Sequence, residues 1–176
     1  MNEKQRQAIE EFAQCIREVY QIGLPFSDNI DRVIEELGGK LERITPECWG
    51  YSELYLRTKI WESKFTIKVA PHIRKGTQDY EIARQIGHLF MHTTFVDTIQ
   101  DDSKALLFTK DVCNSEFGLQ ANEFAYTLIM PRHEFVQEVR KNTENGKVNM
   151  QKVARKFDVN YNDAIYRGKT LELIEF

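Results

Sequence analysis

The sequence contains few cysteines, and their spacing does not suggest a shared role. Cys15, Cys48 and Cys113 are scattered over 176 residues without any C-x-x-C spacing. An odd number of cysteines without paired spacing argues against the disulfide framework of a small secreted protein. We therefore expect reduced thiols and a cytoplasmic location.

Long apolar runs are also absent. The N-terminus, MNEKQRQAIEEF, is charged from its start, and no apolar stretch has the length of a signal-peptide core or a membrane span. The sequence therefore predicts a soluble chain with no membrane partner.

The chain has no excess of positive charge. It carries 24 lysines and arginines against 27 aspartates and glutamates, which gives a formal net charge of -3. This balance excludes a chain-wide attraction to nucleic acid and leaves only a local basic patch open. With 41% hydrophobic and 29% charged residues, the composition is that of an ordinary soluble globular protein.

Apolar periodicity divides the chain into helical and extended segments. Helical spacing predicts helices over residues 3–21, 30–37, 79–92, 117–130 and 133–140, and two short helices joined by a turn at residues 158–160. Between the second and third helices, β-branched and aromatic residues alternate with polar ones, which predicts a small, mostly antiparallel sheet. The fold class is therefore α+β.

Residues 80–93, YEIARQIGHLFMHT, form the most informative segment. They resemble the core helix of the ImmA/IrrE family of zinc metallopeptidases, which contains the motif A-H-E-L-G-H. In an H-E-x-x-H motif the two histidines lie about 40° apart on one helix face and hold zinc, while the glutamate is the general base. The corresponding residues here are Arg84, Gln85 and His88.

Two further segments extend the resemblance. Residues 118–131, GLQANEFAYTLIMP, are similar to the family block E-x-x-A-N-x-F-A-x-x-L-L-M-P, and residues 152–174 are similar to the family's C-terminal helical element. The leading glutamate of that block is the family's third zinc ligand. Gly118 takes its place.

The resemblance implies a compact zincin-like domain over residues 1–146. It also implies a helix-turn-helix-like element over residues 147–176, packed on the same domain. Family members are intracellular regulators, often encoded by phages or mobile elements, that cleave a repressor or another transcription factor. A protein partner of that kind is therefore expected.

The substituted positions remove the chemistry of the family. The guanidinium of Arg84 stays protonated and has no lone pair for zinc, the amide of Gln85 is not a general base, and Gly118 has no side chain. We therefore expect a pseudoenzyme without catalytic residues or a cofactor. Its vacated cleft would bind a partner through side chains that surround the lost site, namely Arg84, Gln85, His88, His92 and Asn122.

Two questions about this site stay open from sequence. A rebuilt zinc site, and with it a rearranged endopeptidase, would need His88 and His92 together with a carboxylate from Asp79, Glu116 or Glu123. Arg84 either replaces the positive charge of zinc within the old cleft, beside His88 and Asn122, or points into solvent.

The C-terminal element offers a third interpretation. Its basic residues would make a helix-turn-helix contact with DNA, although Asp158, Asp163, Glu172 and Glu175 dilute the charge. DNA binding is therefore possible but not favoured. The basic residues concerned are Lys152, Arg155, Lys156, Arg167 and Lys169.

Overall fold

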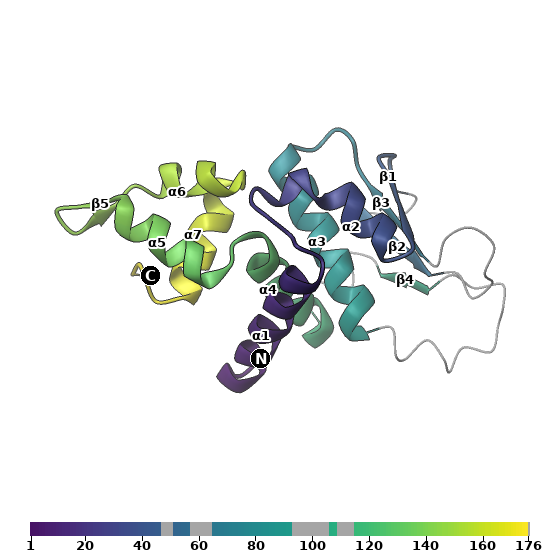
Figure 1. Cartoon of the computed structure of the whole chain (residues 1–176), viewed down its shortest axis with the longest axis horizontal. Coiled ribbons are helices and arrows are strands. Elements are labelled where there is room, and N and C mark those ends of the chain that lie inside the picture. Colours follow the sequence, from purple (N-terminus) through teal and green to yellow (C-terminus); the bar gives the residue numbers. More distant parts are fainter. Residues whose placement is uncertain (47–50, 57–64, 93–105, 109–114, 176) are drawn as a thin grey trace.

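Helices account for most of the chain that the computed structural model describes, which covers residues 1–46, 51–56, 65–92, 106–108 and 115–175. Together with a small sheet they form an α+β fold, as predicted (Figure 1). The α-helices are α1 (Glu3–Val19), α2 (Ile30–Glu36), α3 (Lys75–His92), α4 (Glu116–Ile129), α5 (Arg132–Lys141), α6 (Met150–Phe157) and α7 (Tyr161–Thr170).

The main sheet has four short strands in the order β1-β3-β2-β4. Strand β2 runs antiparallel to both β3 and β4, whereas β1 runs parallel to β3. The prediction of a mostly antiparallel sheet is therefore confirmed. The strands are β1 (Gly39–Glu42), β2 (Ser52–Leu56), β3 (Phe65–Val69) and β4 (Leu106–Phe108).

Helix α3 lies at the centre of the molecule, with the sheet on one side and α4 on the other (Figure 1). Buried Leu54 of β2 and Ile82 of α3 belong to one hydrophobic core that continues to Phe124 of α4. At Gly87 the two helices approach so closely that an added Cβ would lie 3.1 Å from a Phe124 ring atom and 3.3 Å from the Ala121 backbone. This close approach fixes how the motif helix faces α4.

Helix α3 begins at Lys75, one turn earlier than the predicted start at residue 79. The backbone carbonyl of Arg74 accepts hydrogen bonds from the amides of Thr77 and Gln78, which closes the first turn. Gly76 allows this turn to pack on the loop between α6 and α7, because an added Cβ would lie 2.7 Å from the Asp158 carbonyl oxygen. Tertiary packing therefore overrides the low helix propensity of glycine.

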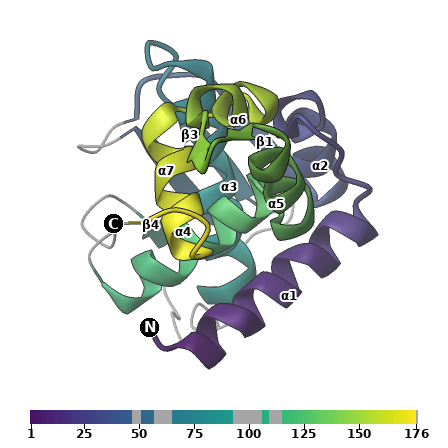
Figure 2. The same ribbon diagram turned by 90° about the vertical axis from the view of Figure 1, so that its left-hand side faces the viewer.

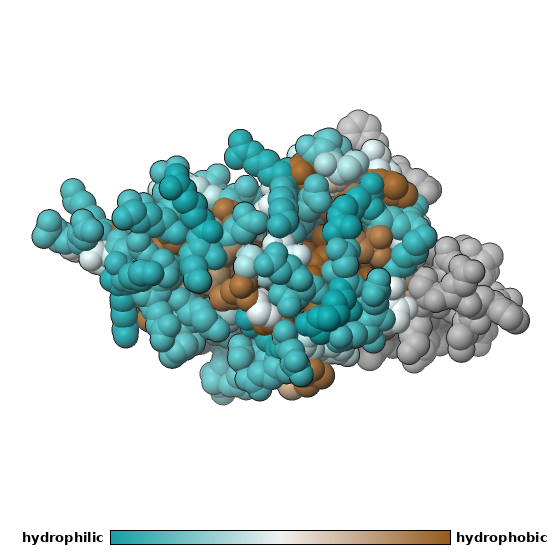
Figure 3. All heavy atoms as spheres, turned by 45° about the horizontal axis from the view of Figure 1, so that its top comes forward, coloured by the Kyte–Doolittle hydropathy of each residue, from teal (hydrophilic) through white to brown (hydrophobic). Residues whose placement is uncertain are grey.

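The C-terminal helices form the other end of the molecule. After α5, the hairpin of β5 (Thr143–Glu144) and β6 (Lys147–Val148) leads into α6, and α6 and α7 are joined by a turn with Asp158 in the left-handed conformation. The predicted pair of short helices is confirmed. Helix α7 lies beside α4 (Figure 2), and the end that carries α5, α6 and the hairpin has a mainly hydrophilic surface (Figure 3).

None of the helices within the described ranges is both long and apolar enough to cross a membrane.

Candidate functional site

The three motif positions of α3 are buried rather than exposed to a catalytic cleft. Arg84 is 3% exposed, and Gln85 and His88 are 0% exposed. Arg84 and Gln85 contact strand β2, and His88 contacts His92 at the end of α3. Because these side chains are buried, their polar groups need partners within the protein. Each of the three side chains has such a hydrogen-bond partner.

Arg84 is neutralised by a carboxylate of its own helix. Its Nη2 lies 2.8 Å from Glu81 Oε2 and also donates to Ser52 Oγ of β2 at 3.2 Å, while its Nε donates to the same Glu81 oxygen at 3.2 Å. Glu81 is itself mostly buried, with 12% of its side chain exposed. The interpretation that Arg84 points into solvent is therefore wrong.

The side-chain amide of Gln85 links α3 to strand β2. Its Nε2 donates to Ser52 Oγ at 2.8 Å, and Ser52 donates to Glu81 Oε2 at 2.6 Å. One serine of β2 thus joins the former base position, the former first-ligand position and the acidic partner. The network ties α3 to the sheet through hydrogen bonds, two of which involve charged groups.

His88 and His92 form a contact along α3. Their Nδ1 atoms lie 3.0 Å apart, and His92 Nε2 lies 3.1 Å from Gln120 Oε1. Because the Gln120 amide nitrogen faces the carboxylate of Glu116, its oxygen accepts from His92. His92 then carries its proton on Nε2, and His88 donates through Nδ1 to the second ring.

Both imidazoles are held in the neutral form. Burial, the nearby positive charge of Arg84 and the neighbouring His92 lower the pKa of His88 to about 3. Burial also lowers the pKa of His92, against a hydrogen bond to Gln120 that raises it. The centroids of these two neutral rings lie 5.0 Å apart.

The second family block places its residues along α4. Gly118 is buried one turn before Asn122 on the same side of the helix. Within the described chain, the hydrogen-bond partner of Asn122 is Tyr80, whose hydroxyl donates to Asn122 Oδ1 at 2.8 Å. The structure therefore joins Asn122 to the N-terminal half of α3 rather than to Arg84 or His88.

The three carboxylates considered for a rebuilt zinc site point elsewhere. Asp79 lies nine residues before His88 on α3, about half a turn around the helix axis, and faces Lys75 and Asp158. Glu116 binds Gln5 and Gln120, and Glu123 belongs to a separate ion cluster. Among the described residues, no group of three or more potential metal ligands comes together.

These residues do not fit the zinc ion of the family. Zinc is held in proteins by thiolate, imidazole or carboxylate, and a catalytic site needs three such ligands beside its water. A guanidinium paired with its own carboxylate and a glycine occupy two of the three ligand positions. The remaining ligand position holds one imidazole, that of His88, which alone does not make a zinc site.

A buried ion cluster that the sequence did not reveal joins both ends of the chain. Arg167 of α7 is 0% exposed and donates to Glu123 of α4 at 3.1 Å, to Glu10 of α1 at 2.8 Å and to the Met130 carbonyl at 3.1 Å. Exposed Arg132 pairs with Glu10 at 2.9 Å. Arg167 therefore cannot contact DNA, contrary to its inclusion among the candidate DNA-binding residues.

Burial and charge act in opposite directions within this cluster. Burial raises the pKa of Glu123 despite the charge of Arg167, whereas the hydrogen bonds and charges of Arg132 and Arg167 outweigh burial at Glu10 and lower its pKa. No local pattern in the sequence predicts this cluster. The partners of Arg167 lie 44 and 157 residues away along the chain.

Comparison with known proteins agrees with this architecture. Residues 54–169 match the family model described as the IrrE N-terminal-like domain of peptidases. A solved structure, a Mycobacterium tuberculosis transcriptional regulator, is similar with a TM-score of 0.59 and 15% sequence identity over 94% of this chain and 47% of that one. This chain thus spans about half the length of that protein, and the likeness concerns the fold.

No curated protein matches the chain. The family match covers most of the sequence and includes the motif helix, the α4 block and the C-terminal pair of helices. The chain belongs to the IrrE N-terminal-like family, the family that its sequence resembles.

Proposed function

We propose that this chain is a noncatalytic member of the IrrE-like family, a regulator that binds a protein partner without cleaving it. The observation that carries the proposal is the closed network of Arg84, Gln85, Ser52 and Glu81. Each group that stands at a catalytic position already has a partner inside the protein. Partner binding can persist without those groups, whereas hydrolysis cannot.

The chemistry of peptide hydrolysis explains why this network excludes the family's reaction. A metallopeptidase needs a Lewis acid to activate water and a base to take up its proton. Arg84 repels a metal cation at the first-ligand position, and Gln85 does not titrate. His88 is neutral, but one imidazole is two ligands short of a catalytic metal site.

The binding role rests on the surfaces that survive around this network. Strand β4 is the outermost strand on one side of the described sheet and offers backbone groups to an extended peptide, the mode of recognition called β-augmentation. The proposed cleft runs along α3, where the buried side chains of Arg84, Gln85, His88 and His92 support it from inside the protein, and it reaches the partly exposed Asn122 of α4. A repressor or another transcription factor is the expected partner.

Two findings support the regulatory setting. The family is that of the IrrE N-terminal-like domain, and the similar Mycobacterium tuberculosis protein is a transcriptional regulator. The phage or mobile-element origin and the cytoplasmic location implied by the resemblance stay predictions. The proposal also keeps residues 147–176 as an element of the same domain, supported by the contacts of Arg167 with Glu10 and Glu123.

An endopeptidase with a rearranged site is the alternative. One observation favours it, namely the His88–His92 pair with 3.0 Å between its Nδ1 atoms. Two imidazoles four residues apart on a helix are a common start for a zinc site. This alternative needs a further ligand, which the described residues do not bring to the pair.

The fate of a bound partner tests the proposal. The chain would be co-expressed with transcription factors encoded beside its gene, and complexes would be isolated and weighed by mass spectrometry. We expect a complex that contains the full-length partner, weakened by Asn122→Ala in the cleft but not by the matched change Asn162→Ala on the surface of α7. Specific fragments of the partner, lost on His88→Ala, would establish the peptidase instead.

A further inference from the structure

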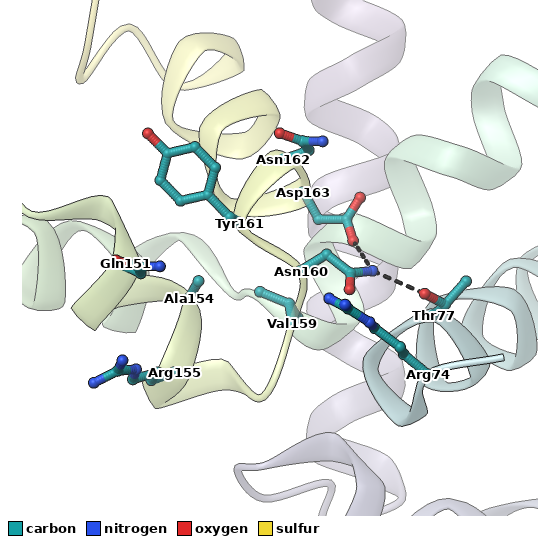
Figure 4. Close-up of a pocket in the computed structure, with 10 residues that line it drawn as sticks. All are labelled: Arg74, Thr77, Gln151, Ala154, Arg155, Val159, Asn160, Tyr161, Asn162 and Asp163. Carbon is teal, nitrogen blue, oxygen red and sulfur yellow. Dashed lines mark hydrogen bonds between the residues drawn. The ribbon is translucent and has the colours of Figure 1, made fainter.

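A hollow lies away from the motif network, where the beginning of α3 meets the α6–α7 pair. Its volume is about 580 Å³, within the range of roughly 300–1,000 Å³ typical of small-molecule sites. Figure 4 shows its lining residues, which come from both parts of the chain. They are Arg74, Thr77, Gln151, Ala154, Arg155, Val159, Asn160, Tyr161, Asn162 and Asp163.

Two cations of this lining have no acidic partner among the residues that the structure describes. Arg74 precedes α3 and Arg155 lies on α6; both are exposed, and neither forms an ion pair within the part of the chain that the structure describes. Neighbouring Lys75, in contrast, pairs with Asp158 at 3.6 Å. Two further exposed cations of α6, Lys152 and Lys156, are the sequence neighbours of the lining residues Gln151 and Arg155.

The acidic residue of the lining is occupied by donors. Asp163 accepts a hydrogen bond from Asn160 Nδ2 at 3.0 Å and another from the Tyr126 hydroxyl at 3.3 Å. Burial raises the pKa of its carboxyl group. Both carboxylate oxygens of Asp163 are therefore already used by neutral donors of the protein.

The uncharged lining residues favour a polar ligand that contains an aromatic ring. Amide groups of Gln151, Asn160 and Asn162 supply donors and acceptors. Tyr161 is 51% exposed, so a face of its ring is open to stacking. Guanidinium groups bind phosphate through paired N–H donors, and an aromatic face suits a nucleobase.

We propose that this hollow binds a small phosphate-bearing ligand of nucleotide size, with Tyr161 against the base. Arg74 and the exposed Arg155 lie apart in Figure 4, and the ligand would draw both onto its phosphates. The site does not depend on the noncatalytic role proposed for the α3–α4 face. Asn160 Nδ2 donates to Thr77 Oγ1 at 2.9 Å, so the lining already joins α7 to α3. A ligand held by Arg74 and Arg155 would strengthen that connection and stabilise the docked C-terminal element.

Thermal unfolding and titration calorimetry of the full chain test the site with two probes, inorganic pyrophosphate and ATP without magnesium. We expect saturable binding of both probes and a rise in melting temperature. Arg74→Ala and Arg155→Ala should each weaken both probes by about tenfold, the value of one charge-assisted hydrogen bond. Arg140→Ala, which removes an exposed cation of α5, is the matched control and should leave affinity unchanged.

Tyr161→Ala separates the phosphate from the base. It should weaken ATP and leave pyrophosphate unaffected, and an equal loss for both probes would contradict the stacking role. The melting temperature of each variant without ligand verifies that it is folded. If neither probe shows saturable binding, the proposal is overturned. Binding of a short DNA duplex in that case would assign the basic residues to DNA instead.

Discussion

Two buried guanidinium groups, those of Arg84 and Arg167, are satisfied over very different distances along the chain. Arg84 pairs with Glu81, three residues earlier on α3, and with Ser52 of the adjacent strand. Arg167 pairs with Glu10 and Glu123, 157 and 44 residues away. The first network closes within one face of α3 and the sheet, while the second joins α1, α4 and α7.

The Arg84 network lies at the positions of the family's motif, whereas the Arg167 network holds three helices together. At position 84 the cation stands where the family motif has a metal ligand, and its charge is neutralised locally by Glu81. At position 167 the cation compensates carboxylates that two other helices bring into the core. Changes to the first network should therefore act locally, and changes to the second should affect the whole fold.

The largest expected effect is that of Arg167→Ala. Glu123 would stay buried with the partly exposed Arg6, 3.4 Å away, as its remaining described ionic partner. Breaking a buried ion pair costs about 3–5 kcal/mol of the free energy of unfolding. Urea unfolding followed by circular dichroism measures it. Arg132→Ala is the control, since its side chain is 56% exposed and the loss should stay below about 1 kcal/mol. Equal losses of stability for Arg167→Ala and Arg132→Ala would show that the buried position of Arg167 has no special role in the fold.

Arg84→Ala should cost less, about 2 kcal/mol, because Ser52 can still donate to Glu81 and part of that carboxylate reaches solvent. A double-mutant cycle with Glu81→Ala isolates the interaction between the two side chains. A coupling energy near zero would show that the pair is not what holds Arg84 in place. Arg43→Ala, which breaks an exposed pair with Asp31, provides the reference.

The imidazole pair predicts a loss of stability in acid. The pKa of His88 is about 3 in the folded chain against an ordinary value of 6.5, so the unfolded chain binds more protons between these values. Its contribution is complete above pH 6.5 and is lost as the pH falls toward 3. Between pH 6.5 and about 5, His88→Asn should remove about 2 kcal/mol of that pH dependence, at about 1.4 kcal/mol for each pH unit, whereas His72→Asn, at an exposed residue, serves as the control. Parallel profiles for both variants would contradict a neutral buried His88.

The opposite sign is expected for Asp79 at the other face of α3. Burial raises its pKa from 3.8 to about 6, so the folded chain binds more protons in this range and stability falls as the pH rises from 3.8 to 6. Asp79→Asn should therefore stabilise the chain by about 1–2 kcal/mol at neutral pH. The gain should disappear below pH 3.8. A loss of stability at neutral pH would show that the Asp79 carboxylate has a favourable partner.

The sequence predicted the elements whose signal is local. Alternation and helical periodicity identified the sheet and the helices, and the motif segments identified the family. Strand β4 has three residues, too few for a detectable alternation, and the early start of α3 depends on packing between Gly76 and the Asp158 carbonyl. Local patterns carry no information about such contacts.

The same limit applies to the site. The chemistry lost at Arg84, Gln85 and Gly118 followed from side-chain type alone. The burial of Arg84 against Glu81 had a local sign in the i, i+3 spacing of the two residues. The Arg167 cluster and the hollow beside Arg74 had none, because both are assembled from segments far apart in the sequence.

Zinc content tests the central claim, that a hydrogen-bond network has replaced the metal site, most directly. Wild-type chain and the variant Arg84→His/Gln85→Glu/Gly118→Glu would be equilibrated with zinc, dialysed and measured by elemental mass spectrometry. We predict far less than one zinc per wild-type chain and close to one per folded variant chain. Close to one zinc per wild-type chain, lost on His88→Ala, would contradict the account, and a folded variant without zinc would show that α3 and α4 are not aligned as the family motif requires.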